Sequence, residues 1–193
     1  KEDSSSGDEE PSEQAPVPPK PQSDEEAMFQ LICSAIVADC ESTLRSTETP
    51  QGKAFDWLAN NREANPNIMD VPDARKIQRY ALATFYFSTQ GGDWENQSGW
   101  LTVQDECEWF SDSISPCSSD GQSLVSMEFN FNNIQGELPF ELSLLTSLTT
   151  LSLRNPDENE PYIRGSLPSH LDSLTALKSL AISGNMLSSG IPL

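Results

Sequence analysis

The sequence has few basic residues, a single histidine and no long apolar run. Eleven lysines and arginines stand against 30 acidic residues, so the formal net charge is −19. Such a chain repels phosphate groups, which argues against a nucleic-acid partner and against an anionic membrane surface. The most apolar window, LICSAIVA at 31–38, is much shorter than the ~20 residues of a membrane-spanning helix. We therefore expect contact with a membrane only through a segment outside this chain.

The sequence also lacks the common catalytic motifs. It contains no G-x-S-x-G, no HExxH and no phosphate-cradling glycine loop. The only histidine, His170, lies beside Ser169 and Asp172 in PSHLDSL. A serine–histidine–aspartate triad is assembled from distinct structural elements, and three neighbours on one turn rarely form one. One histidine without a cysteine cluster offers no zinc site. We predict a non-catalytic protein with no metal site and no cofactor.

The N-terminal end is acidic and poor in large apolar residues. Residues 1–26 hold nine acidic and two basic side chains. A segment of this composition cannot bury enough surface to offset the entropy of the chain. We therefore predict a disordered acidic tail over residues 1–23.

Three helices are predicted after the tail. Ser23 and Glu26 have the spacing of a capping box, and apolar residues at helical spacing follow, so one helix is expected over 24–45. A second is expected over about 51–60 and a third over about 72–88. The tryptophans that follow are expected to pack as a small core, and the alternative for them is an exposed sugar-stacking platform. They are Trp94, Trp100 and Trp109.

Four cysteines allow three pairings. Cys107 and Cys117 lie close together among turn-forming residues and are expected to form a disulfide. Cys33 and Cys40 lie within the first predicted helix, where two turns would separate their Cα atoms by roughly 10 Å. That distance is too long for a bridge, so both are predicted to be small buried hydrophobes. The triplet NQS makes Asn96 a candidate N-glycosylation site if the chain is secreted.

A pattern occurs three times toward the C-terminus. LVSMEFNFNNIQGELP aligns with LTTLSLRNPDENEPYIRGSLP after a shift of 24 residues, and with LKSLAISGNMLSSGIP after a further shift of 29. Each copy reads L-x-x-[LM]-x-[LIF], then an Asn-bearing turn, an apolar residue, a glycine step and [LI]-P. This is the leucine-rich repeat pattern, whose period is about 20–29 residues.

The glycine step before [LI]-P resembles plant-type extracellular leucine-rich repeats. CEWFSDSISPC resembles the signature of their N-terminal caps, although its cysteines are three residues further apart and its Gly-Val is missing. TPQGKAFDWLANN and QRYALATFYFSTQGGDWENQSGWL look most like receptor-like leucine-rich repeat proteins of diatoms and related algae. The resemblance covers roughly residues 45–193. It implies an α/β solenoid, a right-handed leucine-rich repeat coil, with a helical, disulfide-bridged cap region over 24–122 and three repeats over 123–193.

In such a coil the outward residues of each strand form a concave binding face. Asn132 and Asn185 are expected to bond backbone groups at the bend after the strand. Phe131 is a candidate anchor, or else it folds against a neighbouring loop. The longer second repeat carries an acidic insertion at 157–160, read either as a functional loop or as surface drift. The candidate binding residues are Glu128, Asn130, Phe131, Thr150, Ser152, Arg154, Ser179, Ala181 and Ser183.

The resemblance implies a protein- or peptide-recognition module of a receptor-like or secreted protein that acts outside the cell. Two alternatives remain: an inhibitor of secreted hydrolases, because plant-type repeats resemble the polygalacturonase inhibitors, and a structural cell-surface protein that binds polysaccharide. The chain begins at Lys1 and stops inside the third repeat. We therefore expect a fragment, with a targeting or anchoring segment and further repeats outside it.

Overall fold

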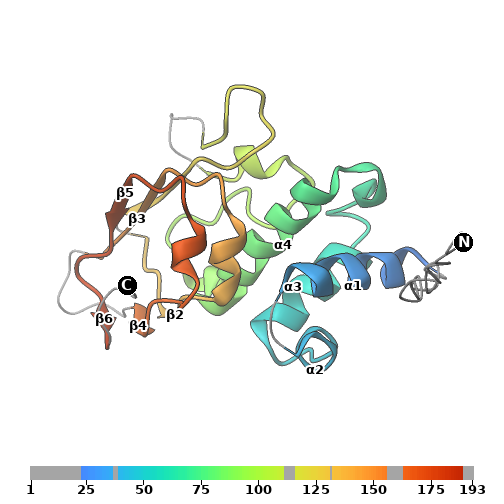
Figure 1. The fold of residues 1–193 in the computed structure, drawn as a ribbon, viewed down its shortest axis with the longest axis horizontal. Helices are drawn as coiled ribbons and strands as arrows, with labels where there is room; N and C mark the ends of the chain where they lie inside the picture. Colours follow the sequence, from blue (N-terminus) through green and yellow to red (C-terminus); the bar gives the residue numbers. More distant parts are fainter. Residues whose placement is uncertain (1–22, 37–38, 111–115, 131, 156–162, 189–193) are drawn as a thin grey trace, which may run out of the picture.

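The computed structural model describes residues 23–36, 39–110, 116–130, 132–155 and 163–188. Helices make up the N-terminal part of this structure, and two small parallel sheets with short 3-10 helices between their strands make up the C-terminal part (Figure 1). The predicted tail up to residue 22, the candidate anchor Phe131 and the acidic insertion at 157–160 lie outside the described residues.

The helices begin and end largely where local sequence signals place them. Ser23 caps the first helix, its Oγ accepting a hydrogen bond from the Glu26 backbone N–H at 3.1 Å. Thr49 caps the third in the same way, and Pro50 occupies its first turn. The predictions for 51–60 and 72–88 are confirmed. The α-helices are α1 (Asp24–Ala35), α2 (Cys40–Leu44), α3 (Pro50–Asn60) and α4 (Asp73–Ser88), with the 3-10 helices η1 (Ile68–Asp70), η2 (Gly91–Asp93) and η3 (Glu106–Glu108) between and after them.

The single helix predicted over 24–45 is wrong. The chain leaves α1 after Ala35 and starts α2 at Cys40, where Asp39 accepts hydrogen bonds from the backbone and the hydroxyl of Ser42. The break brings Cys33 and Cys40 to a Cα–Cα distance of 5.3 Å, and they form a disulfide. The prediction of two free cysteines is therefore also wrong, because it assumed an unbroken helix. Asp39, a favoured N-cap residue, was the signal for the break.

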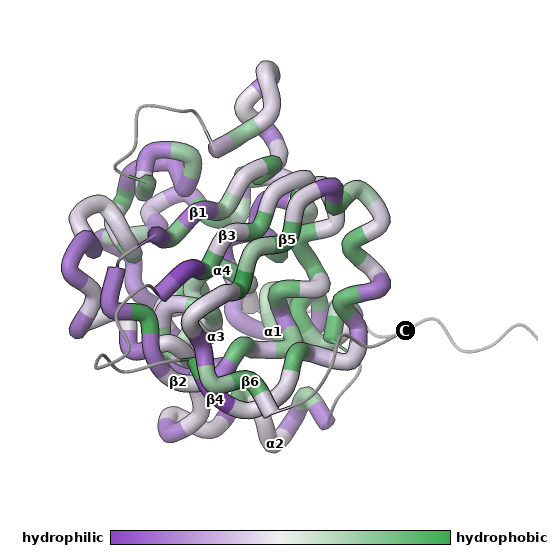
Figure 2. Tube along the Cα trace, turned by 90° about the vertical axis from the view of Figure 1, so that its left-hand side faces the viewer, coloured by the Kyte–Doolittle hydropathy of each residue, from purple (hydrophilic) through white to green (hydrophobic). Residues whose placement is uncertain are grey.

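Two parallel sheets follow, each built from one strand per sequence repeat. Ser126 pairs with Thr150 and Thr150 with Ser179, so the 24- and 29-residue offsets of the repeat are also the offsets of the strand register. Figure 2 shows the strands of each sheet side by side. One sheet contains β1 (Ser126–Asn130), β3 (Thr150–Arg154) and β5 (Ser179–Ala181), and the other contains β2 (Gly136–Glu137), β4 (Ile163–Gly165) and β6 (Met186–Leu187).

The expected α/β solenoid, a right-handed leucine-rich repeat coil, is wrong. The described residues form mixed helices and two small three-stranded parallel sheets, neither of them closed or curled into a coil. The strands are short, five residues in β1 and two in β2. The 3-10 helix η4 (Phe140–Leu144) packs on α4, and Phe129 of β1 meets Phe85 of α4 with ring centroids 5.5 Å apart. The sequence pattern predicts which strands pair, but it does not predict how they pack against α4.

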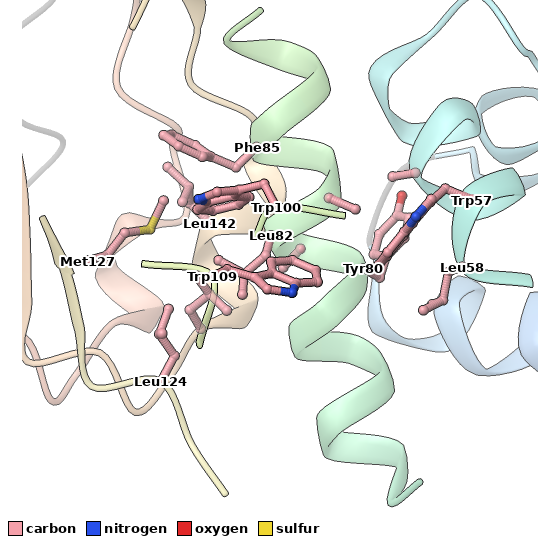
Figure 3. Packing of buried hydrophobic residues seen from close by; sticks show 14 of the residues in the cluster. Trp57, Leu58, Tyr80, Leu82, Phe85, Trp100, Trp109, Leu124, Met127 and Leu142 are labelled. Carbon is pink, nitrogen blue, oxygen red and sulfur yellow. The ribbon is translucent and has the colours of Figure 1, made fainter. Parts of the chain in front are cut away.

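Helix α4 lies at the centre of the core. Tyr80, Leu82 and Phe85 are fully buried on it. Figure 3 shows Trp57, Leu58 and Tyr80 on one side of α4 and Trp100, Met127 and Leu142 on the other. One apolar cluster therefore joins the helices to the sheets.

The three tryptophans form part of this core, as predicted. Trp94, Trp100 and Trp109 are 3%, 6% and 1% exposed, and the ring centroids of Trp94 and Trp100 lie 4.9 Å apart. Trp109 packs on Trp100 at 5.3 Å. Rings buried to this extent do not form an exposed sugar-stacking platform.

Candidate functional site

Most of the predicted binding residues that the structure describes meet on the outward face of the β1–β3–β5 sheet. In β1 the side chains of Met127 and Phe129 are buried, whereas those of Glu128 and Asn130 are exposed. The register places Asn130 beside Arg154. Strand alternation therefore gathers residues from three repeats on one face. We call the following set the sheet face: Glu128, Asn130, Thr150, Ser152, Arg154, Ser179 and Ala181. The eighth described candidate, Ser183, lies in the turn after β5 and outside the strand register.

The sheet face is polar, and its side chains are held by short contacts. The Ser152 hydroxyl donates to Asn130 Oδ1 at 3.0 Å across the two strands. The Ser126 hydroxyl donates to Glu128 Oε1 at 2.9 Å along β1. Ser152 is buried by its neighbours, whereas Glu128 and Arg154 remain exposed. The face therefore offers fixed polar groups and two opposite charges to a partner.

Asn132 and Asn185 bond backbone groups, as predicted, but those of different segments. Asn185 Nδ2 donates to the carbonyls of Leu153 and Ile182 at 2.7 and 3.0 Å, and its Oδ1 accepts from the Ile163 N–H at 3.2 Å. It thus joins the third repeat to the second. Asn132 instead pairs with the backbone of Asn96, accepting at 2.6 Å and donating at 3.2 Å. It joins the end of β1 to the tryptophan segment.

The candidate glycosylation site Asn96 is exposed, and its backbone is held by the two hydrogen bonds with Asn132. The Ser98 hydroxyl donates to Asn96 Oδ1 at 3.2 Å. Because Asn132 fixes the backbone of Asn96, the site lies close to the Asn130 end of the sheet face.

Two disulfides are present. The predicted bridge Cys107–Cys117 is confirmed, with a Cα–Cα distance of 5.6 Å, and Cys33–Cys40 accompanies it. Two disulfides indicate an oxidising environment of the kind found outside the cell. Within the described residues, no helix combines the length and the apolar character that crossing a bilayer requires.

A cleft of about 490 Å³ was not foreseen from the sequence. We call it the Arg75 cleft. The largely buried Arg75 and Arg79 of α4 line it together with residues 64–68 and 70–72, Val103, Asp105, Glu106 and Gln122. The two arginines are one helical turn apart and so share a face of α4. The sequence shows two arginines at this spacing, but it does not predict the residues with which they pair.

The arginines of the Arg75 cleft hold a buried carboxylate. Glu106 is 1% exposed and accepts hydrogen bonds from Arg75 Nε at 2.7 Å, Arg79 Nη1 at 3.0 Å and Gln78 Nε2 at 2.8 Å. Burial opposes ionisation of Glu106, but the bonds from Arg75 and Gln78 outweigh it and hold the pKa of the carboxyl below its usual value. The hydrogen bond that Arg75 donates to Glu106 also raises the pKa of Arg75. Both groups are therefore charged at neutral pH.

Arg79 lies between aromatic rings. Its guanidinium carbon is 4.8 Å from the ring centroid of Trp109 and 5.4 Å from that of Trp57. Its Nη2 donates to the Thr102 carbonyl at 3.1 Å. These contacts fix the loop before the Cys107–Cys117 bridge on helix α4.

A second buried carboxyl connects the helices to the repeats. Glu141 in η4 is 3% exposed and accepts a hydrogen bond from Gln51 Nε2 at 3.2 Å. Burial raises the pKa of this carboxyl, with partial compensation from the hydrogen bonds that it accepts. Its position joins α3 to η4.

The residues around the only histidine show no assembled triad. His170 is exposed and packs edge-on against Phe140, with ring centroids 5.1 Å apart. Among the residues that the structure describes, no group of three or more His, Cys, Asp or Glu is placed to hold a metal ion.

No model of a known protein family matches the chain, and a search of curated proteins finds no similar sequence.

Proposed function

We propose that this chain is a non-catalytic recognition module that binds a protein or a peptide through the sheet face. The observation that supports this most is the register of the β1–β3–β5 sheet. It aligns polar side chains of three repeats on one outward surface. Polar side chains fixed side by side on one exposed surface can form several hydrogen bonds to a partner at once.

The chemistry of the sheet face suits a protein partner. Glu128 and Arg154 offer opposite charges, and Asn130 and Ser152 are already oriented by their mutual hydrogen bond. Groups fixed before binding lose little entropy when the partner arrives, so the face is prepared for hydrogen-bonded recognition.

The chain acts outside the cell in this proposal, either as a secreted protein or as part of a receptor-like protein anchored through another segment. The two disulfides support the location. A relationship to plant-type leucine-rich repeat proteins is part of the proposal. It is supported by the sequence pattern, whose offsets equal those of the strand register.

The two alternatives differ in their support. Polysaccharide binding on Trp94 and Trp100 is disfavoured because both rings are buried. Inhibition of a secreted hydrolase remains compatible with the sheet face, since an inhibitor is also a protein-recognition module.

Charge reversal on the two sheets tests the proposal. The chain is screened against a panel of secreted and cell-surface proteins, and each partner is then measured with two double variants. Glu128→Arg with Arg154→Glu changes the sheet face. Glu137→Arg with Arg164→Glu changes residues of the other sheet that are also exposed and serves as the matched control.

We expect the sheet-face variant to weaken binding roughly tenfold or more and the control to leave it unchanged. Partners that tolerate the sheet-face variant would contradict the proposal. So would turnover of a glycan or peptide substrate by the purified chain.

A further inference from the structure

We propose that the Arg75 cleft is a second binding site, which takes an extended, basic peptide segment of a partner protein. None of its lining residues belongs to the sheet face, so the site uses a different set of residues and goes beyond the function proposed above. Its volume of about 490 Å³ lies within the range of about 300–1,000 Å³ found for ligand sites.

The rim of the Arg75 cleft combines apolar and acidic groups. Val103 is 61% exposed, one of two large hydrophobic side chains that stand out as exposed among the described residues, and Pro66 and Pro72 are exposed near it. Asp70 and Asp105 carry exposed carboxylates along the same lining. A long basic side chain satisfies both, because its aliphatic stem packs on apolar surface while its charged end meets a carboxylate.

The charge balance selects a cation over an anion. Three carboxylates and two guanidinium groups line the Arg75 cleft. Glu106 is neutralised by Arg75 and Arg79, and Asp105 also accepts from Arg75 Nη2 at 2.8 Å. The arginines therefore have little charge left for a phosphate or a carboxylate, whereas Asp70 forms no ion pair with another described residue and adds a negative charge.

A metal ion does not fit the same carboxylates. Glu106 already accepts from three side chains, so its oxygens are not available as ligands. Asp105 accepts from Arg75 and from the Cys107 N–H. A divalent cation would have to break these bonds to gain enough oxygen ligands.

The arginines supply what a peptide backbone needs. A guanidinium group carries five N–H donors. Arg75 uses three of its nitrogens once each, on Glu106, Gly121 and Asp105. Each terminal nitrogen of Arg75 therefore keeps one N–H group that donates to no acceptor among the described contacts. Peptide carbonyls can accept from these N–H groups, and because they are neutral they add no negative charge.

The test uses two arrays of capped octapeptides and the full chain. One array is composed of valine, proline and lysine, and the other has glutamate in place of lysine. The best lysine peptide is then measured in solution by fluorescence anisotropy, at low and at high salt. Asp70→Lys and Val103→Ser change the Arg75 cleft. Asp172→Lys and Met186→Ser are matched controls, because Asp172 is also an exposed carboxylate on a 3-10 helix and Met186 is 64% exposed.

We expect only lysine peptides to bind, with an affinity that falls as salt increases. Asp70→Lys should weaken binding roughly tenfold and Val103→Ser a few-fold, and both controls should stay within about twofold of the unmodified chain. Absence of binding from both arrays, equal binding of glutamate peptides, or an affinity indifferent to Asp70→Lys would overturn the proposal. The double variant at Glu128 and Arg154 should leave peptide affinity unchanged. Loss of affinity there would assign the peptide to the sheet face instead.

Discussion

Replacement of Glu106 by glutamine removes the negative charge at the centre of the Arg75 cleft. Arg75 keeps Asp105 as a charged partner at 2.8 Å, but Arg79 is left with carbonyl oxygens and Asn65. Both guanidinium groups stay largely buried. Breaking a buried ion pair from one side costs roughly 3–5 kcal/mol, because the remaining charge keeps its desolvation penalty.

A loss of that size is easily measured. For a chain of this length, 1 kcal/mol corresponds to about 2–4 °C in Tm, so Glu106→Gln should lower the Tm by roughly 6–20 °C. Thermal unfolding followed by circular dichroism under non-reducing conditions gives the value. The exposed neighbour Glu108, changed to glutamine, is the control and should shift the Tm by less than about 2 °C.

The pH dependence gives an independent check. The pKa of Glu106 is held below its usual value, so the native state binds fewer protons at this group than the unfolded chain. Its stabilisation is present above the unfolded pKa and is lost as pH falls through the folded pKa. Part of the acid sensitivity below about pH 4 should therefore disappear in Glu106→Gln. A Tm within about 2 °C of the unmodified chain at pH 7 would refute the buried-pair reasoning.

Three further predictions concern other parts of the molecule. Burial raises the pKa of Glu141, so its contribution to stability is present below the unfolded pKa and lost as pH rises through the folded pKa. Glu141→Gln should therefore stabilise the chain by roughly 1 kcal/mol at pH 7, measured by urea unfolding. A loss of stability in this variant would contradict the argument. Replacing Cys33 and Cys40 together by serine should cost about 2–3 kcal/mol and loosen the facing ends of α1 and α2, seen as faster hydrogen exchange at 32–36 and 39–44. Unchanged exchange there would mean that the bridge does not hold these helix ends. Expression through a secretory pathway should add one N-glycan at Asn96, which a glycosidase removes and which Asn96→Gln lacks. A mass that glycosidase treatment leaves unchanged would count against the site.

Much of the secondary structure follows from local signals in the sequence. Pro50 and Pro72 mark the starts of α3 and α4, and the repeat offset predicts the pairing of Ser126 with Thr150. The prediction of one helix over 24–45 fails because apolar residues keep their helical spacing across the break between α1 and α2. Asp39 marks that break as the N-cap of α2. The N-cap therefore decides where the second helix starts, although the apolar pattern continues. The disulfide between Cys33 and Cys40 depends on that break.

The shape and the Arg75 cleft depend on contacts between distant segments. Arg75 meets Glu106 across 31 positions and Gly121 across 46, and no spacing rule predicts such pairs. The same holds for Gln51 and Glu141, which lie 90 positions apart and help join the helices to the repeats. The repeat pattern alone suggested a coil because it contains no information on how α4 packs against the strands.

The measurement that tests the central claim most directly is hydrogen exchange on the chain with and without a bound protein partner. Recognition through the sheet face predicts slower exchange on binding at 126–130, 150–154 and 179–181, with 136–137 and 163–165 unchanged. Protection confined to the second sheet or to α1–α3, with the sheet face exchanging as in the free chain, would contradict it.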